Sequence, residues 1–251
     1  KRRRCAMTSF VAWFTSSIVY GTVIMYGALG ETLTQKSGQL NLGVPGMVYL
    51  GAFAGFAGGF MYEKTAASTN EFLLVLIPLL CGFGGGALGG LLYSLMTVVL
   101  KANQNVTGLA LTFLGVGIGT FGGIYVLADA GFLSFATARE TAALFNMNIN
   151  AYIEAGVFGE MFLSYGFMVY AAIILAIVMF IIMRRTRIGL NLRAVGESPA
   201  TADAAGINVN RYKIAASTIG GGICGLGGMV YVFMYGHGGW AATTSIEALG
   251  W

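Results

Sequence analysis

The sequence of 251 residues predicts an all-α fold, a polytopic transmembrane helix bundle with about six spans. Hydrophobic residues make up 57% of the chain and charged residues 10%, and the mean hydropathy is +0.76. A soluble domain of this composition would expose large apolar patches and aggregate. Six stretches contain no Asp, Glu, Lys or Arg: 5–30, 37–62, 72–100, 102–128, 161–183 and 214–246. Each exceeds the roughly 20 residues that a helix needs to cross the hydrocarbon core.

The same stretches exclude two other architectures. Strands of a membrane barrel alternate polar and apolar residues, whereas 72–80 and 170–182 are apolar on every side. Cys5, Cys81 and Cys224 lie in or at the edge of apolar stretches, which is typical of small buried hydrophobes rather than of a disulfide framework. The basic residues lie in loops, so the sequence pI of about 9.0 does not indicate a nucleic-acid partner.

Glycines form regular stripes along four of the stretches. They recur three or four residues apart at Gly51, Gly55 and Gly58, at Gly82, Gly86 and Gly90, and at Gly221, Gly225 and Gly228. In the fourth stretch the same spacing runs through Gly108, Thr112, Gly115, Gly119 and Gly122. Such spacing places small residues on one helix face. In lipid, where water exclusion does not press helices together, close backbone contact supplies the attraction. The pattern predicts a tightly packed bundle.

Charges between the stretches predict which loops face the cytosol, because cytosolic loops are enriched in Lys and Arg. The segment 184–213 holds six basic and two acidic residues and is predicted to be cytosolic, and 129–160 holds one basic and four acidic residues and is predicted to be an external loop. Alternation then places eight Lys and Arg inside against two outside, and it places Lys1 to Arg4 outside, against the rule. Either one stretch does not cross, or this end, which does not begin with Met, belongs to a longer chain.

The second stretch is interrupted at its start. Residues 37–46 are polar or helix-breaking, which leaves 47–62 as regular helix of about 24 Å, short of a full span. Pro45 suits the first turn of a helix because it lacks an amide proton. The sequence therefore predicts a half-helix that starts near Pro45, with its positive dipole end facing a cavity.

Polar residues beside this break and at the start of the fourth stretch are candidates for a substrate pathway. The set comprises Gln39, Asn41, Pro45, Gln104, Asn105 and Thr107. Two ordinary interfacial loops would account for the same residues, and this alternative stays open.

Catalytic motifs are absent from the sequence. His237 is the single histidine, and neither H-E-x-x-H nor G-x-S-x-G occurs, so we expect no catalytic residue, no metal site and no cofactor bound by this chain. The uncharged stretches offer no carboxylate for a proton relay, which disfavours a proton-driven carrier. Because G-x-x-x-x-G-K-[ST] is also absent, energy must come from a partner, or the protein is passive.

The cytosolic segment 184–213 is organised as helices. Ser198 suits an N-cap, Pro199 the first helical position and Gly206 the terminator, so 199–205 is predicted to be a short exposed helix with small side chains. A second short helix precedes it, with one apolar face formed by Ile188, Leu192 and Val195. A small-residue helix held in the cytosol is suited to a groove on a partner protein.

Two separated motifs carry a family resemblance. The segment 193–207, R-A-V-G-E-S-P-A-T-A-D-A-A-G-I, with T-R-I-G-L at 186–190, resembles the coupling loop of ATP-binding cassette (ABC) importer permeases for simple sugars, nucleosides and branched-chain amino acids. The segment 38–52, G-Q-L-N-L-G-V-P-G-M-V-Y-L-G-A, resembles N-[IL]-G-x-E-G-[MQ]-x-x-x-G-A of the nucleoside and simple-sugar branch. Pro45 stands where that branch commonly has Glu, so no role of that acid carries over.

The resemblance implies a multi-pass permease subunit of a bacterial plasma (inner) membrane. It would pair with a second permease subunit as a homo- or heterodimer, with cytosolic ATPase subunits that bind and hydrolyse ATP, and with an extracytoplasmic solute-binding protein. The chain itself would be no enzyme but would import a small polar solute, a nucleoside or simple sugar, by alternating access. The resemblance also implies about two further spans after Gly250 and Trp251, so we expect the chain to continue.

Coupling to the ATPase is assigned to one group in the cytosolic loop: Arg193, Gly196, Glu197, Ser198, Pro199, Asp203 and Gly206. Three alternatives stay open at this point. The chain could serve a branched-chain amino acid importer, act as a passive glycine-packed channel or facilitator, or be a structural membrane subunit without a pathway.

Overall fold

The computed structural model describes residues 2–66, 68, 70–128, 138–147 and 162–240, except the side chains of 2–12 and 124–128. Its elements run in the order α1 (Arg2–Lys36), α2 (Val44–Thr65), α3 (Glu71–Ser94), η1 (Leu95–Val99), α4 (Gln104–Ala128), α5 (Arg139–Phe145), α7 (Phe167–Arg185), α8 (Arg187–Glu197), α9 (Pro199–Ala204), α10 (Val209–Val230) and η3 (Tyr231–Tyr235). The η elements are π-helical turns that continue α3 and α10.

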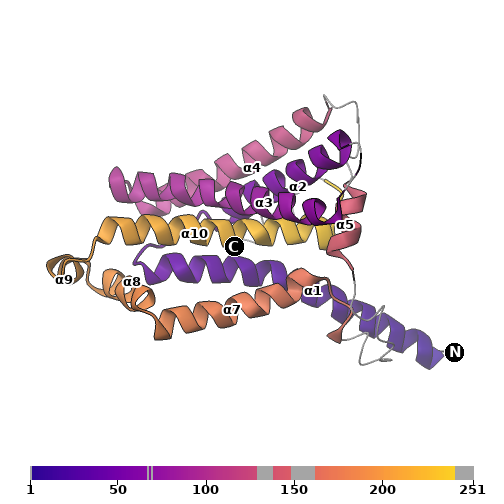
Figure 1. Ribbon diagram of the computed structural model, residues 1–251, viewed down its shortest axis with the longest axis horizontal. Coiled ribbons are helices and arrows are strands. Elements are labelled where there is room, and N and C mark those ends of the chain that lie inside the picture. Colours follow the sequence, from indigo (N-terminus) through magenta and orange to yellow (C-terminus); the bar gives the residue numbers. More distant parts are fainter. Residues whose placement is uncertain (1, 67, 69, 129–137, 148–161, 241–251) are drawn as a thin grey trace.

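The long helices run roughly along one axis and form the predicted all-α bundle (Figure 1). In the described part of the chain, five helical stretches are long and apolar enough to cross a membrane: Val44–Thr65, Glu71–Val99, Gln104–Gly123, Phe167–Arg185 and Val209–Tyr235. They correspond to the second to sixth predicted spans. The first predicted span, 5–30, lies within α1.

The predicted half-helix is wrong. α2 has 22 residues, enough for about 33 Å, and it begins at Val44 with Pro45 in its first turn. Gly43 is the N-cap, so only 37–43 remains outside the helices. The predicted start near Pro45 is correct to within one residue. The predicted length was too short, because Val44 to Gly46 already have helical geometry and because Glu63 and Lys64 extend the last turn.

The external loop predicted at 129–160 lies largely outside the described residues. Its described part contains α5, which packs against α2, α3 and η3. The Thr141 N–H in the first turn of α5 donates to Glu63 Oε1 at 2.7 Å. The Asn146 side-chain amide donates to the Phe233 carbonyl at 2.8 Å, so this part of the loop is fastened to the bundle.

α10 is the central helix of the bundle. It packs against α1, α2 and α3, and 78% of its apolar stretch is buried, against 22% for α7. The predicted glycine stripes form its contacts. A β-carbon at Gly221 would lie 2.5 Å from the Gly86 carbonyl oxygen, and one at Gly90 would meet the Ser217 carbonyl. The backbones of α3 and α10 are therefore in direct contact, as the stripes predict.

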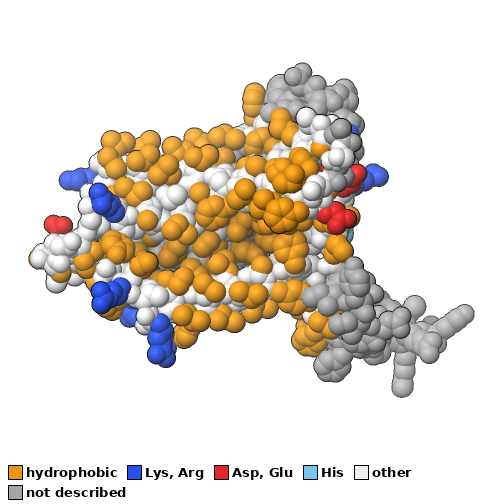
Figure 2. All heavy atoms as spheres, viewed as in Figure 1, with side chains coloured by type: hydrophobic (Ala, Val, Ile, Leu, Met, Phe, Trp, Pro, Cys, Tyr) orange, Lys and Arg blue, Asp and Glu red, His pale blue; other side chains and the backbone are white. Residues whose placement is uncertain are grey.

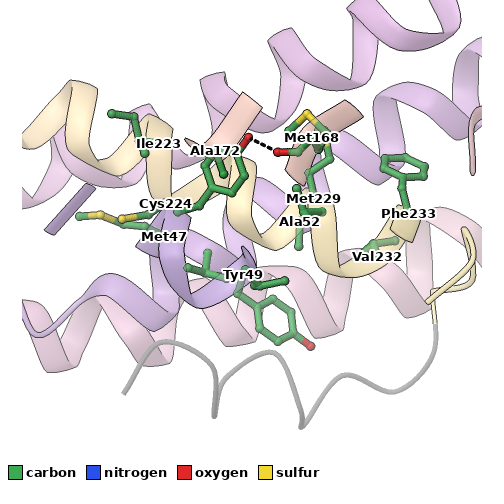
Figure 3. Close-up of a cluster of buried hydrophobic side chains, with 14 of the residues drawn as sticks. Met47, Tyr49, Ala52, Met168, Ala172, Ile223, Cys224, Met229, Val232 and Phe233 are labelled. Carbon is green, nitrogen blue, oxygen red and sulfur yellow. Dashed lines mark hydrogen bonds between the residues drawn. The ribbon is translucent and has the colours of Figure 1, made fainter. Parts of the chain in front are cut away.

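Aromatic and sulfur-containing side chains of α2, α7, α10 and η3 gather in a buried cluster (Figure 3). Met47, Phe56, Met229 and Phe233 are fully buried in one apolar cluster. The Tyr26 hydroxyl on α1 donates to the Met168 carbonyl on α7 at 3.0 Å, the bond dashed in Figure 3. This bond joins the peripheral α7 to the core.

Charged side chains gather at the two ends of the bundle (Figure 2). α8 and α9 lie at one end, whereas α5 and the start of α1 lie at the other (Figure 1). This arrangement agrees with the predicted alternation, which places the cytosolic segment 184–213 and the external loop on opposite sides.

Candidate functional site

The end of the bundle formed by α8 and α9 carries the predicted coupling residues. Thr186 caps α8, since its hydroxyl accepts from the Gly189 N–H at 3.2 Å. Ser198 is the N-cap residue of α9, as predicted, but its hydroxyl bonds to the Thr201 hydroxyl at 2.8 Å instead of capping the backbone. Pro199 is the first residue of α9.

Gly206 ends α9 as predicted. It has φ of +80°, a conformation that side chains with a β-carbon disfavour. Its N–H donates to the Asp203 carbonyl at 2.9 Å, and the Ile207 N–H donates to the Ala202 carbonyl at 3.0 Å. This pair of bonds is the glycine-terminated helix end called a Schellman motif.

α9 projects from the bundle with most of its surface exposed. Ala202 is its one buried residue among the six of the helix. A groove of about 580 Å³ lies between α9 and the start of α10, lined by Pro199, Ala200, Asp203, Gly206, Ile207, Asn208, Val209 and Asn210. The short helix and the groove form a free surface of small and polar groups.

The predicted apolar face of α8 is correct for Leu192 and Val195, which are buried, and wrong for Ile188, which is 65% exposed. α8 approaches α7 through Gly189, where a β-carbon would meet the Ile182 carbonyl. Ile188 precedes this contact in the first turn of α8 and is not covered by it. The Asn191 side-chain amide ties α8 to α10 by donating to the Tyr212 hydroxyl at 3.0 Å.

The coupling residues do not form one surface. Glu197, Asp203 and Arg193 are all exposed, but Arg193 lines a different groove, between α1 and α7. Gly196 faces inward onto the segment 37–43: a β-carbon built on Gly38 would lie 3.1 Å from the Gly196 Cα. The sequence predicted the two regions separately, and the structure places them in backbone contact.

Gln39 stands at the centre of the segment 37–43. It is 2% exposed, and its amide nitrogen donates to Thr97 Oγ1 on η1 at 3.1 Å. Its amide oxygen accepts from Ser217 Oγ on α10 at 2.5 Å and from Ser37 Oγ at 3.5 Å. One buried side chain therefore joins α3 with its π-turn, α10 and the segment itself.

Asn41 is equally buried and holds the shape of the segment. Its side-chain oxygen accepts from the Gly43 N–H at 2.8 Å, and its side-chain amide donates to Met47 Sδ at 3.4 Å. Its backbone N–H donates to Glu31 Oε1 on α1 at 3.2 Å. Asn41 thus fixes the turn into α2 and links it to α1.

The remaining pathway candidates divide into two groups. Gln104 Oε1 accepts from the Leu40 N–H at 2.9 Å and so joins Gln39 and Asn41, and Pro45 is buried in the first turn of α2. Asn105 is exposed, and Thr107 donates to the Asn103 carbonyl at 2.8 Å within its own helix. Neither of these last two is described in contact with the segment.

Several residues of this network were missed in the sequence. Tyr93 donates its hydroxyl to the Leu40 carbonyl at 2.7 Å, and Thr112 donates to the Leu42 carbonyl at 3.2 Å. Glu31 was assigned to a loop because it is the first charge after an uncharged stretch, yet α1 continues past it to Lys36. Its Oε2 is buried without a hydrogen-bond partner in the described residues. The polar residues Ser37, Gln39 and Asn41, directly after Lys36, were the sequence signal for a buried acid at Glu31.

The comparison with protein families gives one match over nearly the whole chain. Residues 13–250 match the family described as "Branched-chain amino acid transport system / permease component". No solved structure gives a significant match.

Curated relatives agree with this match. A protein of Haloferax volcanii, provisionally named a glucose ABC transporter permease, is 31% identical over 88% of this chain and 62% of its own length. A nucleoside ABC transporter permease of Lactococcus lactis is 29% identical over 85% of this chain and 65% of its own length. A guanosine ABC transporter permease of Bacillus subtilis is 29% identical over 86% and 65%. The chain thus spans less than two thirds of each relative. By the family match, it belongs to the permease components of the branched-chain amino acid transport system family.

Proposed function

We propose that this chain is the membrane-spanning subunit of an ABC importer that translocates a small polar solute, a nucleoside or a simple sugar, by alternating access. Its family and its apolar helices make it a multi-pass protein of the plasma membrane. ATP is bound and hydrolysed on separate cytosolic subunits, because the sequence contains no phosphate-binding loop of its own.

The contact between Gly196 and Gly38 is the observation that supports this proposal best. α9 and its groove are exposed at the cytosolic end, where an ATPase subunit can dock. α8 leads from there directly to the segment 37–43. This segment is hydrogen-bonded to α1, α4 and α10 through Asn41, Leu40 and Gln39. A displacement of α9 therefore reaches the junction of these helices through one continuous path.

In this proposal, alternating access arises from movement of the helices that the segment 37–43 joins. The α3–α10 seam is for much of its length a direct contact of glycine backbones, which suits helices that shift as rigid bodies. The 37–43 network is a set of discrete hydrogen bonds that either form or break. In the described conformation Gln39 and Asn41 are occupied by protein partners. Opening toward the cytosol releases these groups, and their amides then face the solute.

The substrate class rests on the relatives. The three reported above are named for glucose, nucleoside and guanosine transport, and all of these solutes carry several hydroxyl or amide groups. Amide side chains such as Gln39 and Asn41 offer the matching donors and acceptors. The second permease subunit and the solute-binding protein are proposed as partners from the family.

Reconstitution separates an ABC permease from a passive channel. The full permease should co-purify with an ATPase subunit from its native host, and vesicles holding the complex and the binding protein should take up a nucleoside or sugar only with ATP. Equal flux without ATP would favour a facilitator instead. Uptake restricted to leucine and its branched analogues would contradict the substrate class but leave the importer intact.

A further inference from the structure

A second groove lies between α1 and α7 near the cytosolic end. Its volume is about 400 Å³, and its lining is mostly apolar: Leu29, Thr32, Lys36, Ala176, Met179, Phe180, Met183, Arg184 and Arg193. The α1 residues Leu29, Thr32 and Lys36 are spaced three and four apart and share one face of the helix. Phe180 on α7 is exposed at 56%. Because α7 is the least buried of the five spanning stretches, the groove opens toward lipid.

Three cations and no acid line this groove. Lys36 ends α1, Arg184 lies in the last turn of α7, and Arg193 comes from α8. The Arg184 guanidinium is held over the Phe180 ring, 4.7 Å from its centre. The acid nearest on α1, Glu31, faces the opposite side of the helix, where it bonds to Asn41. The positive charge is therefore uncompensated within the lining.

The order of these groups along the helix axes matches the order of acyl chain and phosphate in a phospholipid. Apolar side chains from Leu29 and Met179 lie toward the middle of the helices, and the cations lie where α1 and α7 end. Figure 2 shows basic side chains at this end beside the apolar surface of the bundle. Long basic side chains at such an end extend to the headgroup level. Anionic lipids attract Lys and Arg at the cytosolic surface.

We infer that this groove binds one anionic phospholipid of the cytosolic leaflet. An acyl chain lies between α1 and α7 against Phe180 and Met183, and the phosphate is held by Lys36, Arg184 and Arg193. The bound lipid joins α7 and α8 to α1 and shares Arg193 with the predicted coupling group. Charge complementarity selects an anionic over a zwitterionic lipid.

Brominated lipids test the inference without any transport assay. The variant Phe180→Trp keeps an aromatic ring beneath Arg184 and places a fluorophore in the groove. The full permease is reconstituted with phosphatidylglycerol or phosphatidylcholine carrying brominated chains, and the signal of the unmodified protein is subtracted because the chain has three tryptophans of its own. Phosphatidylglycerol should associate more strongly, and each of Lys36→Gln, Arg184→Gln and Arg193→Gln should lower its preference about fivefold.

A matched control variant and competition by inorganic phosphate define the results that would contradict lipid binding in the groove. Val178→Trp places the fluorophore on the same helix at a similar depth but outside the groove lining, where the two lipids should quench alike. Excess inorganic phosphate should not displace the lipid, because it has no chain to fill the groove. Equal quenching by both lipids at Phe180→Trp, the same preference at Val178→Trp, displacement by phosphate, or a preference that survives the triple glutamine variant would each overturn the inference.

Discussion

Gly206 shows how one residue shapes the end of α9. Its φ is +80°, and a β-carbon there would meet nothing within 4 Å. A substitution therefore tests backbone conformation and not space. Gly206→Val should strain the turn by about 1–2 kcal/mol and reduce ATP-dependent uptake, whereas Gly206→Asn should keep most of it, since Asn tolerates the left-handed region. Uptake in vesicles at equal protein content is the measurement, and equal uptake by the two variants would contradict a role for this turn.

Gln39 is a buried polar residue whose loss should destabilise the bundle. Gln39→Leu keeps a similar volume but leaves the Ser217 hydroxyl without its acceptor in a buried site. An unsatisfied buried hydroxyl costs about 1–3 kcal/mol, so the unfolding temperature of the purified permease should fall. Adding Ser217→Ala should recover part of this loss. The exposed Asn105→Leu serves as control, and an equal fall there would show that Gln39 has no special place.

Among the helices, α3 and α10 are held together by a close glycine contact. Gly86 on α3 touches α10 so closely that a β-carbon would meet the Gly221 carbonyl, whereas a β-carbon at Gly84 on the same helix would meet nothing within 4 Å. Gly86→Ala should force the helices apart and lower the unfolding temperature and the yield of folded permease. Gly84→Ala should leave both unchanged or slightly raise them, because Ala favours helix. A thermal-shift series compares the pair, and a similar loss in both variants would refute close packing at the seam.

Elements were predictable from the sequence wherever the signal was local. The uncharged stretches, the glycine stripes and the Ser198 to Gly206 helix each depend on neighbouring residues. The structure bears out the second to sixth stretches, the glycine contacts and the helix. The start of α2 near Pro45 was predicted to within one residue, whereas its length was underestimated because Glu63 and Lys64 were counted as loop. The network around Gln39 was out of reach, since its partners Thr97 and Ser217 come from distant parts of the chain. The roles of the coupling and pathway residues stay predictions.

Sidedness is a property of the whole molecule. The two ends of the bundle carry α9 and α5 respectively (Figure 1). In a permease whose native cysteines are replaced, a membrane-impermeant maleimide should label Arg139→Cys in intact cells. It should label Ala200→Cys only after permeabilisation, because that residue lies in the helix predicted to face the cytosol. Reversed labelling would show that the charge at Lys1 to Arg4, and not the internal loops, sets the orientation.

The meeting of Gly38 and Gly196 has a mechanical consequence for the complete molecule. A junction made by long side chains can yield through rotamer changes, so part of an applied movement is absorbed. Two glycine backbones in contact have no side-chain rotamers to change. In the proposed mechanism, a push on α8 and α9 therefore reaches the segment 37–43 through the backbone itself. The response time expected of this mechanism is that of helices moving as rigid bodies, on the order of microseconds to milliseconds.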